Sequence, residues 1–214
     1  MSTAKITAAL KHARRHQIEA KAEAISVALS TVQLGLPAIV TAAYAATVRA
    51  QAAILTTLNT EIKTMQGQVE AYFGRHPDAE IYLSQPGLGR VLGARVLAEF
   101  GDDKNRYADA KARKNYAGTS PITRQSGKKK LVLARHVHNA RLVDTLGRQA
   151  FRALISSPGA RAYYDRLRGR GVGHNAALRQ LGNRFVGILQ GCLKTVTLYD
   201  EAIAWPNQPP HAAT

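Results

Sequence analysis

Apolar residues recur every three or four positions through most of the chain, which is the spacing of one face of an α-helix. The first such run covers residues 6–29 and predicts a single helix whose other faces carry lysines and arginines. Gly35 and Pro37 then interrupt the pattern, because glycine weakens a helix and proline breaks one. The chain is therefore expected to open with a helix and a break.

The second run, from Ala38 to Phe73, has the most regular spacing in the sequence. Gln51 occupies one position of an otherwise apolar seam whose members are Tyr44, Val48, Leu55, Leu58, Ile62, Met65, Val69 and Tyr72. Such a heptad seam predicts a long helix that pairs with another helix. The partner is either the first helix folded back or the same helix of a second subunit, and the sequence leaves both open.

Beyond Asp78 the apolar runs are shorter and are separated by glycine and proline. Helical spacing recurs at 79–84, 90–100, 108–116, 134–155, 157–167 and 174–204. The stretch 118–130 combines Gly, Ser, Pro and Lys, so it predicts a loop or a short hairpin, and residues 131–133 could supply one strand. We expect a mainly α protein with a helical coiled-coil region (1–77), a compact helical domain (78–206) and a disordered tail (207–214).

Charge gives the first indication of function. The chain has 214 residues, with 30 Lys and Arg against 14 Asp and Glu, for a net charge of +16. These positive charges repel one another in a compact chain, so we expect a polyanionic partner. Nucleic acid is a commoner polyanionic partner than a membrane surface. No secretory signal or uninterrupted membrane-length apolar run is present, and the lone Cys192 lies in an apolar stretch, which predicts a cytoplasmic protein with a core cysteine.

The sequence Pro86-Gly87-Leu88-Gly89 lies between two predicted helices and is typical of the turn in a helix-hairpin-helix. Glycine permits the positive φ of a tight turn, and the second helix then presents its free N–H groups. Those donors suit a DNA phosphate, and Arg90 adds charge beside them. We therefore predict a DNA backbone contact at Gly87, Gly89 and Arg90; the alternative is a plain helical turn capped by glycine.

A cluster of basic residues follows between positions 104 and 141, with Asp109 as the only acid. Its members are Lys104, Arg106, Lys111, Arg113, Lys114, Arg124, Lys128, Lys129, Lys130, Arg135 and Arg141. A run of charge is usually only a solvated face, but this one coincides with a glycine-containing loop. The predicted phosphate contacts within it are Arg124, Lys128, Lys129, Lys130 and Arg135.

Ser126 lies at the centre of this cluster, in Arg124-Gln125-Ser126-Gly127-Lys128. A flexible glycine would let the hydroxyl approach a phosphodiester while the cations stabilise charge on the phosphate. The simpler interpretation is that Ser126 and Gly127 form a turn. Ser120 is a weaker candidate that we expect to shape a turn or cap a helix.

A second candidate pattern would use a tyrosine rather than a serine as the nucleophile. His138-Asn139-Ala140-Arg141 fits the His-x-x-Arg pattern of tyrosine recombinases, and Tyr163 and Tyr164 lie downstream. The tyrosines follow a proline-marked helix start, so packing on helix neighbours explains them more simply. No His, Cys, Asp or Glu cluster has metal-ligand spacing, and no phosphate-binding loop is present.

Several motifs in order resemble the insertion-sequence one-ten transposase family, from about residue 78 to residue 205. They are Tyr82–Gly89, Leu97–Asp102, Arg106–Lys111, Asn115–Pro121, Gln125–Lys128 and Pro158–Tyr164. The resemblance implies an N-terminal RuvC-like domain with metal-binding acids, a helical coiled coil, and a C-terminal domain with a catalytic serine. That serine falls on Ser126, which would form a transient phosphoserine link to DNA.

The resemblance further implies guidance by a structured bridge RNA and assembly into multimers through the coiled coil. The RuvC-like domain has no counterpart in this sequence, so we expect a truncated or separately encoded half. Such a half would bind DNA near the bacterial nucleoid but would be inactive alone, with Mg²⁺ held by the absent domain and no cofactor by this chain. The rival hypothesis is a non-catalytic basic nucleic-acid-binding module in which Ser126 is only a turn residue.

Overall fold

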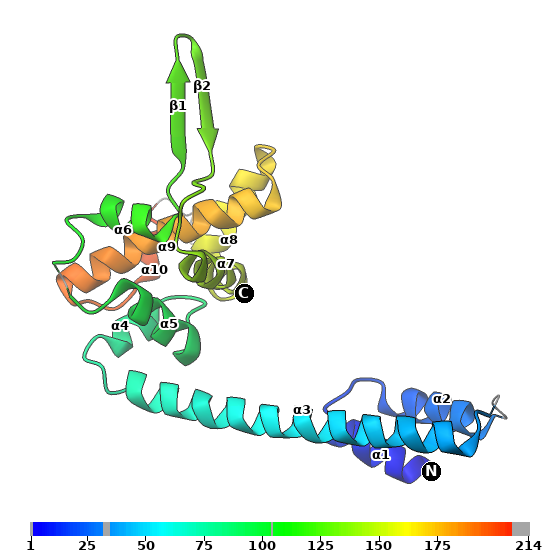
Figure 1. The fold of residues 1–214 in the computed structure, drawn as a ribbon. Coiled ribbons are helices and arrows are strands. Elements are labelled where there is room, and N and C mark those ends of the chain that lie inside the picture. The colour runs from blue at the N-terminus through cyan, green and yellow to red at the C-terminus, as the bar shows by residue number, and fades with distance from the viewer. Residues whose placement is uncertain (1, 32–34, 104, 207–214) are drawn as a thin grey trace, which may run out of the picture. The chain divides into compact units, whose positions relative to one another are not determined.

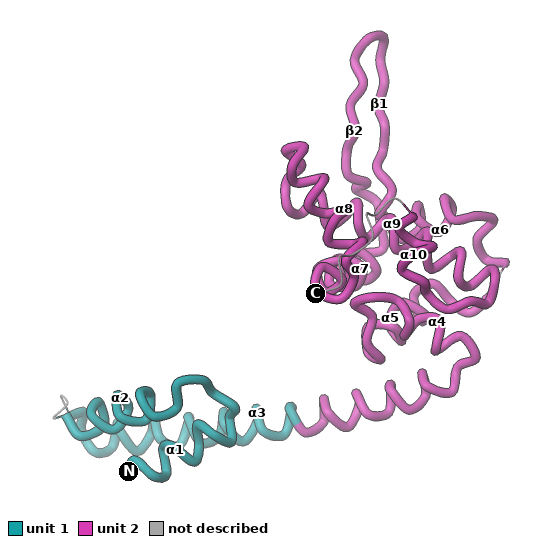
Figure 2. The backbone as a smooth tube through the Cα atoms, turned by 180° about the vertical axis from the view of Figure 1, so that it is seen from behind, with its two compact units in different colours: residues 1–59 teal, residues 60–214 magenta. Residues whose placement is uncertain are grey.

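A computed structural model of the chain describes residues 2–31, 35–103 and 105–206 (Figure 1). These residues form ten helices and one two-stranded sheet, which confirms the mainly α prediction. The chain divides into two compact units, residues 1–59 and 60–214, and α3 (Ala38–Phe73) contributes to both (Figure 2). The predicted regions 1–77 and 78–206 stay a prediction, and the predicted tail 207–214 lies outside the described residues.

The first unit opens with two helices, α1 (Thr3–His12) and α2 (Ile18–Ser30), so the single helix predicted over residues 6–29 is wrong. Arg14 and Gln17 adopt positive φ values of 49° and 55°, which end one helix and start the next. The two helices pack together, Ile6 and Ala22 are buried, and the hydroxyls of Thr3 and Ser26 lie 3.2 Å apart. Burial of apolar surface between the helices thus outweighs continuous helical propensity.

Helix α3 spans 36 residues, as its spacing predicted, but its apolar seam is exposed. Exposed fractions along the seam range from 44% at Val69 to 71% at Tyr72. Among the described residues of α3 only Phe73, at its end, is buried. Pairing of the seam with another helix therefore stays a prediction.

The same helix contains an 18-residue window with a mean hydropathy of 1.4, none of it buried. Its length and composition would suffice to cross a membrane, although Arg49 and Gln51 interrupt the apolar run. An apolar helix that packs against another helix meets the same criteria of length and composition.

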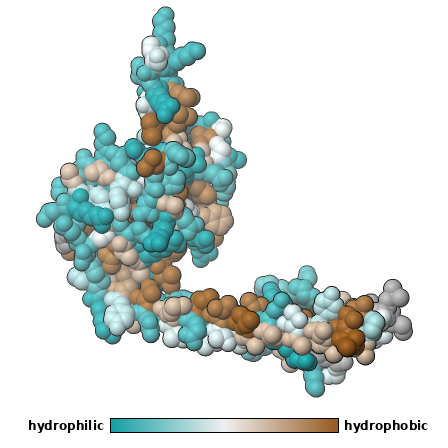
Figure 3. Space-filling view, in the orientation of Figure 1, coloured by the Kyte–Doolittle hydropathy of each residue, from teal (hydrophilic) through white to brown (hydrophobic). Residues whose placement is uncertain are grey.

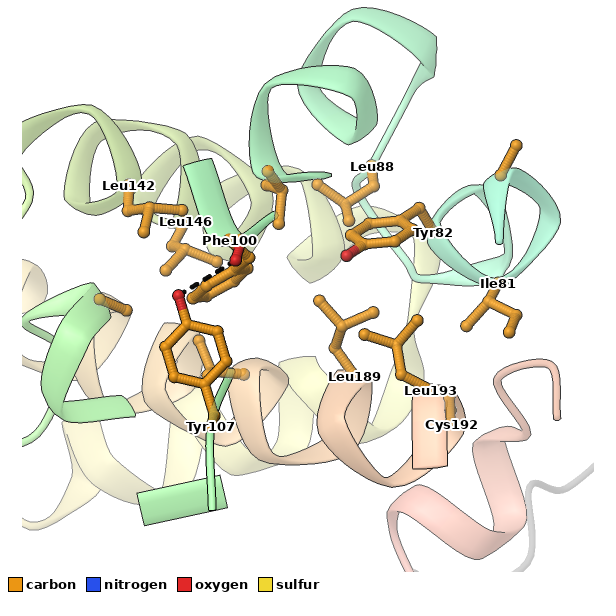
Figure 4. Packing of buried hydrophobic residues seen from close by; sticks show 14 of the residues in the cluster. Ile81, Tyr82, Leu88, Phe100, Tyr107, Leu142, Leu146, Leu189, Cys192 and Leu193 are labelled. Carbon is orange, nitrogen blue, oxygen red and sulfur yellow. Dashed lines mark hydrogen bonds between the residues drawn. The ribbon is translucent and has the colours of Figure 1, made fainter. Parts of the chain in front are cut away.

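The second unit has a core that joins α4 (Ala79–Ser84), α5 (Arg90–Phe100), α6 (Ala110–Ala117), α7 (Ala140–Ser156) and α9 (His174–Thr195). Phe100 lies at its centre, edge-on to Tyr107, whose hydroxyl donates to the Phe100 carbonyl at 3.2 Å (Figure 4). Leu142 and Leu146 from α7 and Leu189 from α9 close around it. The apolar faces that the sequence pattern predicted thus meet in one core.

A neighbouring cluster unites α7, α8 (Pro158–Gly169) and α9 with the short α10 (Glu201–Ala204). The helix predicted over 174–204 is wrong, because α9 ends at Thr195 and Val196 takes a φ of 53°. This break lets Trp205 turn back to lie 6.1 Å from Phe185 and 5.6 Å from Tyr163, measured between ring centroids. Tertiary burial of the tryptophan again overrides local helical preference.

The sheet is a β-hairpin of β1 (Ile122–Ser126) and β2 (Lys129–Leu133). Of the two predicted alternatives, a loop or a short hairpin, the hairpin is therefore correct. Residues 134–139 lead away from it, so α7 begins at Ala140 rather than at residue 134. The Asn139 side chain accepts hydrogen bonds from the backbone N–H groups of Arg141 and Leu142 and thereby caps α7. The Asp109 side chain likewise caps α6, which begins at Ala110, two residues after the predicted start at residue 108.

Candidate nucleic-acid interface

Ser126 is the last residue of β1 and lies at the tip of the hairpin. It pairs with Lys129 across a two-residue turn made of Gly127 and Lys128. Gly127 has a φ of 56°, and a positive φ at the first turn position is what a tight two-residue connection requires. Gly127, predicted as a flexible neighbour that lets the Ser126 hydroxyl approach a phosphodiester, therefore has a defined role in shaping the turn.

Strand register decides which side chains share a face with Ser126. Directly opposed residues point the same way, and successive residues alternate. Ser126 therefore shares its face with its partner Lys129 and with Arg124, two residues earlier, which itself pairs with Leu131. Lys130, opposite Gln125, points to the other face, while Lys128 lies in the turn. Of the predicted phosphate contacts, the structure thus brings Arg124 and Lys129 onto the Ser126 face.

The hairpin is exposed from Thr123 to Leu133 and extends away from the helices of its unit (Figure 1). Figure 3 shows a hydrophilic tip and more apolar surface toward the base, where Leu131, Val132 and Leu133 are 38–58% exposed. Residues 119–134 include no Asp, Glu or His. The positive charge near Ser126 therefore has no counter-charge within the hairpin, and the hairpin itself offers no carboxylate or imidazole as a general base.

The base of the hairpin is anchored to the helices. A Cβ atom at Gly118, which has a φ of 74°, would collide with the His138 side chain, so the segments that lead into and out of the hairpin meet there. The Thr119 hydroxyl donates to Asn183 of α9 at 3.0 Å. Arg135 donates from Nη2 to Asn115 of α6 at 3.2 Å, which gives this predicted phosphate contact a structural role at the hairpin base.

Other members of the basic cluster are also engaged in the fold. Arg113 is 3% exposed and lies over the rings of Phe100 and Tyr107 at 4.9 and 4.8 Å, so it belongs to the core rather than to a solvated cationic face. Arg106 donates to the Phe100 carbonyl at 3.0 Å and lies over Tyr116. Lys104 is outside the described residues. Sequence clustering therefore overstated the number of cations free for a partner.

Arg141 pairs with Glu99 at 3.3 Å, and Asn139 donates to the same carboxylate at 2.7 Å. The hydrogen bond from Asn139, supported by Arg141, lowers the pKa of Glu99. His138 contacts the backbone carbonyl of Arg135, Tyr163 packs on Trp205, and the Tyr164 hydroxyl lies 2.6 Å from His174 Nδ1. These contacts agree with tyrosines that pack on their neighbours.

The predicted contact in the α4–α5 turn separates into two parts. Gly87 has a φ of 80°, and a Cβ there would collide with the Gln149 carbonyl of α7. This glycine therefore lets the turn pack closely against α7. Gly89 and Arg90 lie at the exposed start of α5, where Gly89 provides no side-chain cap. The helix start remains open to an anion at Gly89 and Arg90, and binding there stays a prediction.

The α4–α5 turn and the β-hairpin lie toward opposite ends of the second unit in both backbone views (Figures 1 and 2). The two sets of predicted DNA contacts therefore do not form one patch. Cys192 belongs to neither: it is buried, its thiol accepts from Gln85 at 3.5 Å, and burial raises its pKa. In the described part of the chain, no three His, Cys, Asp or Glu side chains gather as a metal site.

Comparison with known proteins bears on the segment that carries the hairpin. Residues 79–165 match the model of the Transposase IS116/IS110/IS902 family. A protein of the IS117 mini-circle of Streptomyces coelicolor, whose name proposes a transposase, is 54% identical over 137 residues, covering 64% of this chain and 33% of that protein. The chain belongs to this transposase family.

Two further relatives of the family are named only by their insertion elements and masses. An IS900 protein of Mycobacterium paratuberculosis is 36% identical over 146 residues, covering 68% of the chain and 37% of that protein. An IS110 protein of S. coelicolor is 30% identical over 152 residues, covering 70% and 37%. The chain thus spans about a third of the length of these relatives. The family-model match, residues 79–165, includes the hairpin and helices α4 to α7.

Proposed function

We propose that this chain is the DNA-contacting, serine-bearing part of an insertion-sequence transposase, in which Ser126 attacks a DNA phosphodiester. The observation that carries the proposal is the position of Ser126 at an exposed hairpin tip, on one face with Arg124 and Lys129. Membership of a transposase family supports DNA as the polyanion that the charge of +16 calls for.

The reaction is a transesterification. Ser126 Oγ forms a bond to phosphorus while one P–O bond of the DNA strand breaks, and the serine is left as a phosphodiester to one DNA end. The serine proton goes to an acceptor, and the departing DNA oxygen takes up a proton to become a hydroxyl. Arg124 and Lys129 stabilise the negative charge that builds on the non-bridging oxygens.

The hairpin supplies a nucleophile and cations, but the proton acceptor must come from elsewhere, because residues 119–134 include no Asp, Glu or His. The described residues also do not fit a metal site, so no step is assigned to a metal held by this chain. We propose that a RuvC-like region with Mg²⁺ completes the centre. On this proposal the isolated chain binds DNA without completing transposition.

Two partners are proposed alongside DNA. The exposed seam of α3, including Leu58 at 52% and Ile62 at 54%, supports pairing with the same helix of a second copy. Sedimentation of the full chain should show a dimer that Leu58→Glu dissociates, whereas a monomeric wild type would reject the pairing. A structured RNA is the other proposed partner, and its support is the family membership together with the charge.

The second candidate function is a non-catalytic nucleic-acid-binding module. One observation favours it: the Ser126 hydroxyl has no general base within its own hairpin. Both candidates predict salt-sensitive DNA binding, because cation contacts to phosphates release counterions in either case. Binding alone therefore does not separate them, and a covalent product does.

The deciding experiment is an adduct assay with nicked and branched DNA, with and without a supplied RuvC-like half and Mg²⁺, followed by denaturation. Wild type is expected to give a protein–DNA band that Ser126→Ala abolishes while native-gel binding persists. Thr123→Val is the matched control, because it removes a hydroxyl from the opposite face of the same hairpin. If no band forms even with the supplied half, although DNA still shifts, the binding-module function is correct.

A further inference from the structure

A second cationic site lies outside the hairpin and outside the α4–α5 turn. It is a cleft of about 300 Å³ between α8, α9 and the segment that follows α10. Its polar and aromatic lining comprises Tyr163, Arg166, Arg170, Gln180, Arg184 and Trp205. Nothing in the proposed serine chemistry uses these residues.

The cleft has three arginines and no acidic residue in its lining. Asp165, the only acid of α8, is held by Arg161 at 2.8 Å. No ion pair involves Arg166, Arg170 or Arg184 within the described ranges, and residues 207–214 include no acidic side chain. Three cations that share a concave site without a counter-charge favour an anion from outside the chain.

Aromatic rings hold two of these guanidinium groups in place. Arg184 lies 4.6 Å from the Trp205 ring and 5.9 Å from the Tyr163 ring, and Arg166 lies 5.7 Å from the Tyr163 ring. Arg184 Nη2 donates to the Ala204 carbonyl at 2.6 Å, while its buried Nε has no hydrogen-bond partner among the described residues. Planar cations stacked on rings form the kind of surface on which an unpaired base stacks.

We propose that this cleft binds one unpaired nucleotide of a single-stranded nucleic acid. Arg166 and Arg170 hold its phosphate, and its base lies against the Tyr163 and Arg184 side of the cleft. A volume near 300 Å³ is at the low end of about 300–1,000 Å³ for ligand sites, which suits a single nucleotide rather than a duplex. The proposal rests on the proposed function only in taking nucleic acid as the polyanion.

The first test measures fluorescence anisotropy of the full chain with a labelled 12-nucleotide DNA strand, the same RNA strand and the matching DNA duplex. Arg166→Gln should weaken the binding of both single strands about tenfold. It should also lower the salt slope, which is the slope of log affinity against log salt concentration, by about 0.7. The double variant Arg166→Gln/Arg170→Gln should lower this slope by about 1.4. Arg179→Gln is the matched control, because it removes one exposed charge from α9 beside the cleft-lining Gln180. It should change affinity less than twofold.

Duplex binding separates the cleft from a general cationic surface. We expect Arg166→Gln to leave duplex affinity within twofold, whereas an equal loss for duplex and single strands would overturn the proposal. Equal effects of Arg166→Gln and Arg179→Gln would also overturn it. A preference for the RNA strand over the DNA strand would identify a 2′-hydroxyl contact, and equal affinity would assign binding to base and phosphate alone; both outcomes support an unpaired-nucleotide site.

Photocrosslinking with a 5-bromouracil strand supplies a readout that charge alone would not move. The crosslink should map to the peptide containing Tyr163 or Trp205 and should disappear in the double arginine variant. Crosslinks confined to other peptides would reject the cleft. If the wild-type chain fails to bind duplex DNA but still gives this crosslink, the proposed DNA function is contradicted and the cleft assignment stands. Failure of the proposed function and failure of the cleft proposal are therefore distinguishable.

Discussion

The β-hairpin and the helical core of the second unit are specified in different ways. In the core, Phe100 and Leu142 are fully buried, so each side chain is fixed by the neighbours it touches. In the hairpin, the residues from Thr123 to Leu133 are exposed, and their directions follow from strand register alone. The residues proposed for chemistry therefore contribute little to folding, which makes stability and DNA binding separable by substitution.

Phe100→Ala should give the largest loss of stability. Phe100 is 0% exposed and packs on Tyr107 and Arg113, so truncation removes buried apolar surface and leaves a cavity. We expect the free energy of unfolding to fall by about 3–5 kcal/mol in urea titrations. Val132→Ala, in the exposed hairpin, is the control and should lower it by less than about 0.5 kcal/mol. Similar losses for the two variants would remove the contrast between the regions.

The next effect appears at alkaline pH. Burial raises the pKa of Tyr82 to about 12, against the opposing influence of Arg113, whereas the ordinary value is 10.0. The unfolded chain therefore loses this proton first, and the free energy of unfolding should fall as the pH rises from about 10 to 12. The full shift corresponds to about 2–3 kcal/mol.

Tyr82→Phe should flatten this alkaline decline, as measured by urea midpoints at pH 8 and pH 11. Part of the decline should persist, because burial also raises the pKa of Tyr199 to about 12. Tyr72→Phe is the control, since Tyr72 is 71% exposed. An unchanged decline in Tyr82→Phe would show that the buried phenol does not set the pH dependence.

A smaller loss is expected from Glu201→Gln. The Glu201 carboxylate accepts hydrogen bonds from the Gly159 backbone N–H at 2.7 Å, the Ser157 hydroxyl at 2.9 Å and the Tyr199 hydroxyl at 2.7 Å. It therefore places negative charge at the start of α8, and its neutralisation should cost about 1–2 kcal/mol in thermal or urea unfolding. Glu61→Gln, on exposed α3, should have almost no effect, and equal losses would refute the capping role.

The smallest effect on stability should come from the hairpin, where the loss of binding is large. Replacing Arg124, Lys128 and Lys129 with Gln should change the free energy of unfolding by less than about 0.5 kcal/mol. The salt slope of duplex binding should fall by up to about 2.7, or about 0.9 for each phosphate contact.

The control for charge removes three exposed lysines from the first unit, at Lys5, Lys11 and Lys21. If that variant lowers the salt slope as much as the hairpin variant does, net charge rather than the hairpin face governs binding.

Much of the helical framework could be predicted from the sequence, because apolar spacing and proline or glycine breaks are local signals. The bounds of α4 and α5 match their predicted ranges, and α3 was recognised at full length. The breaks before α2 and after α9 could not be predicted, since nothing in the local apolar spacing marks the positive φ that Gln17 and Val196 adopt. Tertiary burial decides such breaks, and local propensity does not encode it.

The candidate site was predictable in composition but not in geometry. The Ser126 cluster was visible as a run of charge, yet the direction of Lys130 depends on a register that follows from the two-residue turn. Arg113 looked like its neighbours Lys111 and Lys114, although it lies on the inward side of α6. The arginine cleft could not be predicted, because only the fold brings Arg184 and Trp205 to Arg166 and Arg170.

The close meeting of Gly118 and His138 has a consequence for how this protein can be altered. The chain leaves and re-enters the helical framework at one place, so the two ends of the segment between these residues lie close together. A short glycine linker should be able to replace it without reshaping the framework. The same geometry would let the tip be exchanged or lengthened while the helical framework keeps its core.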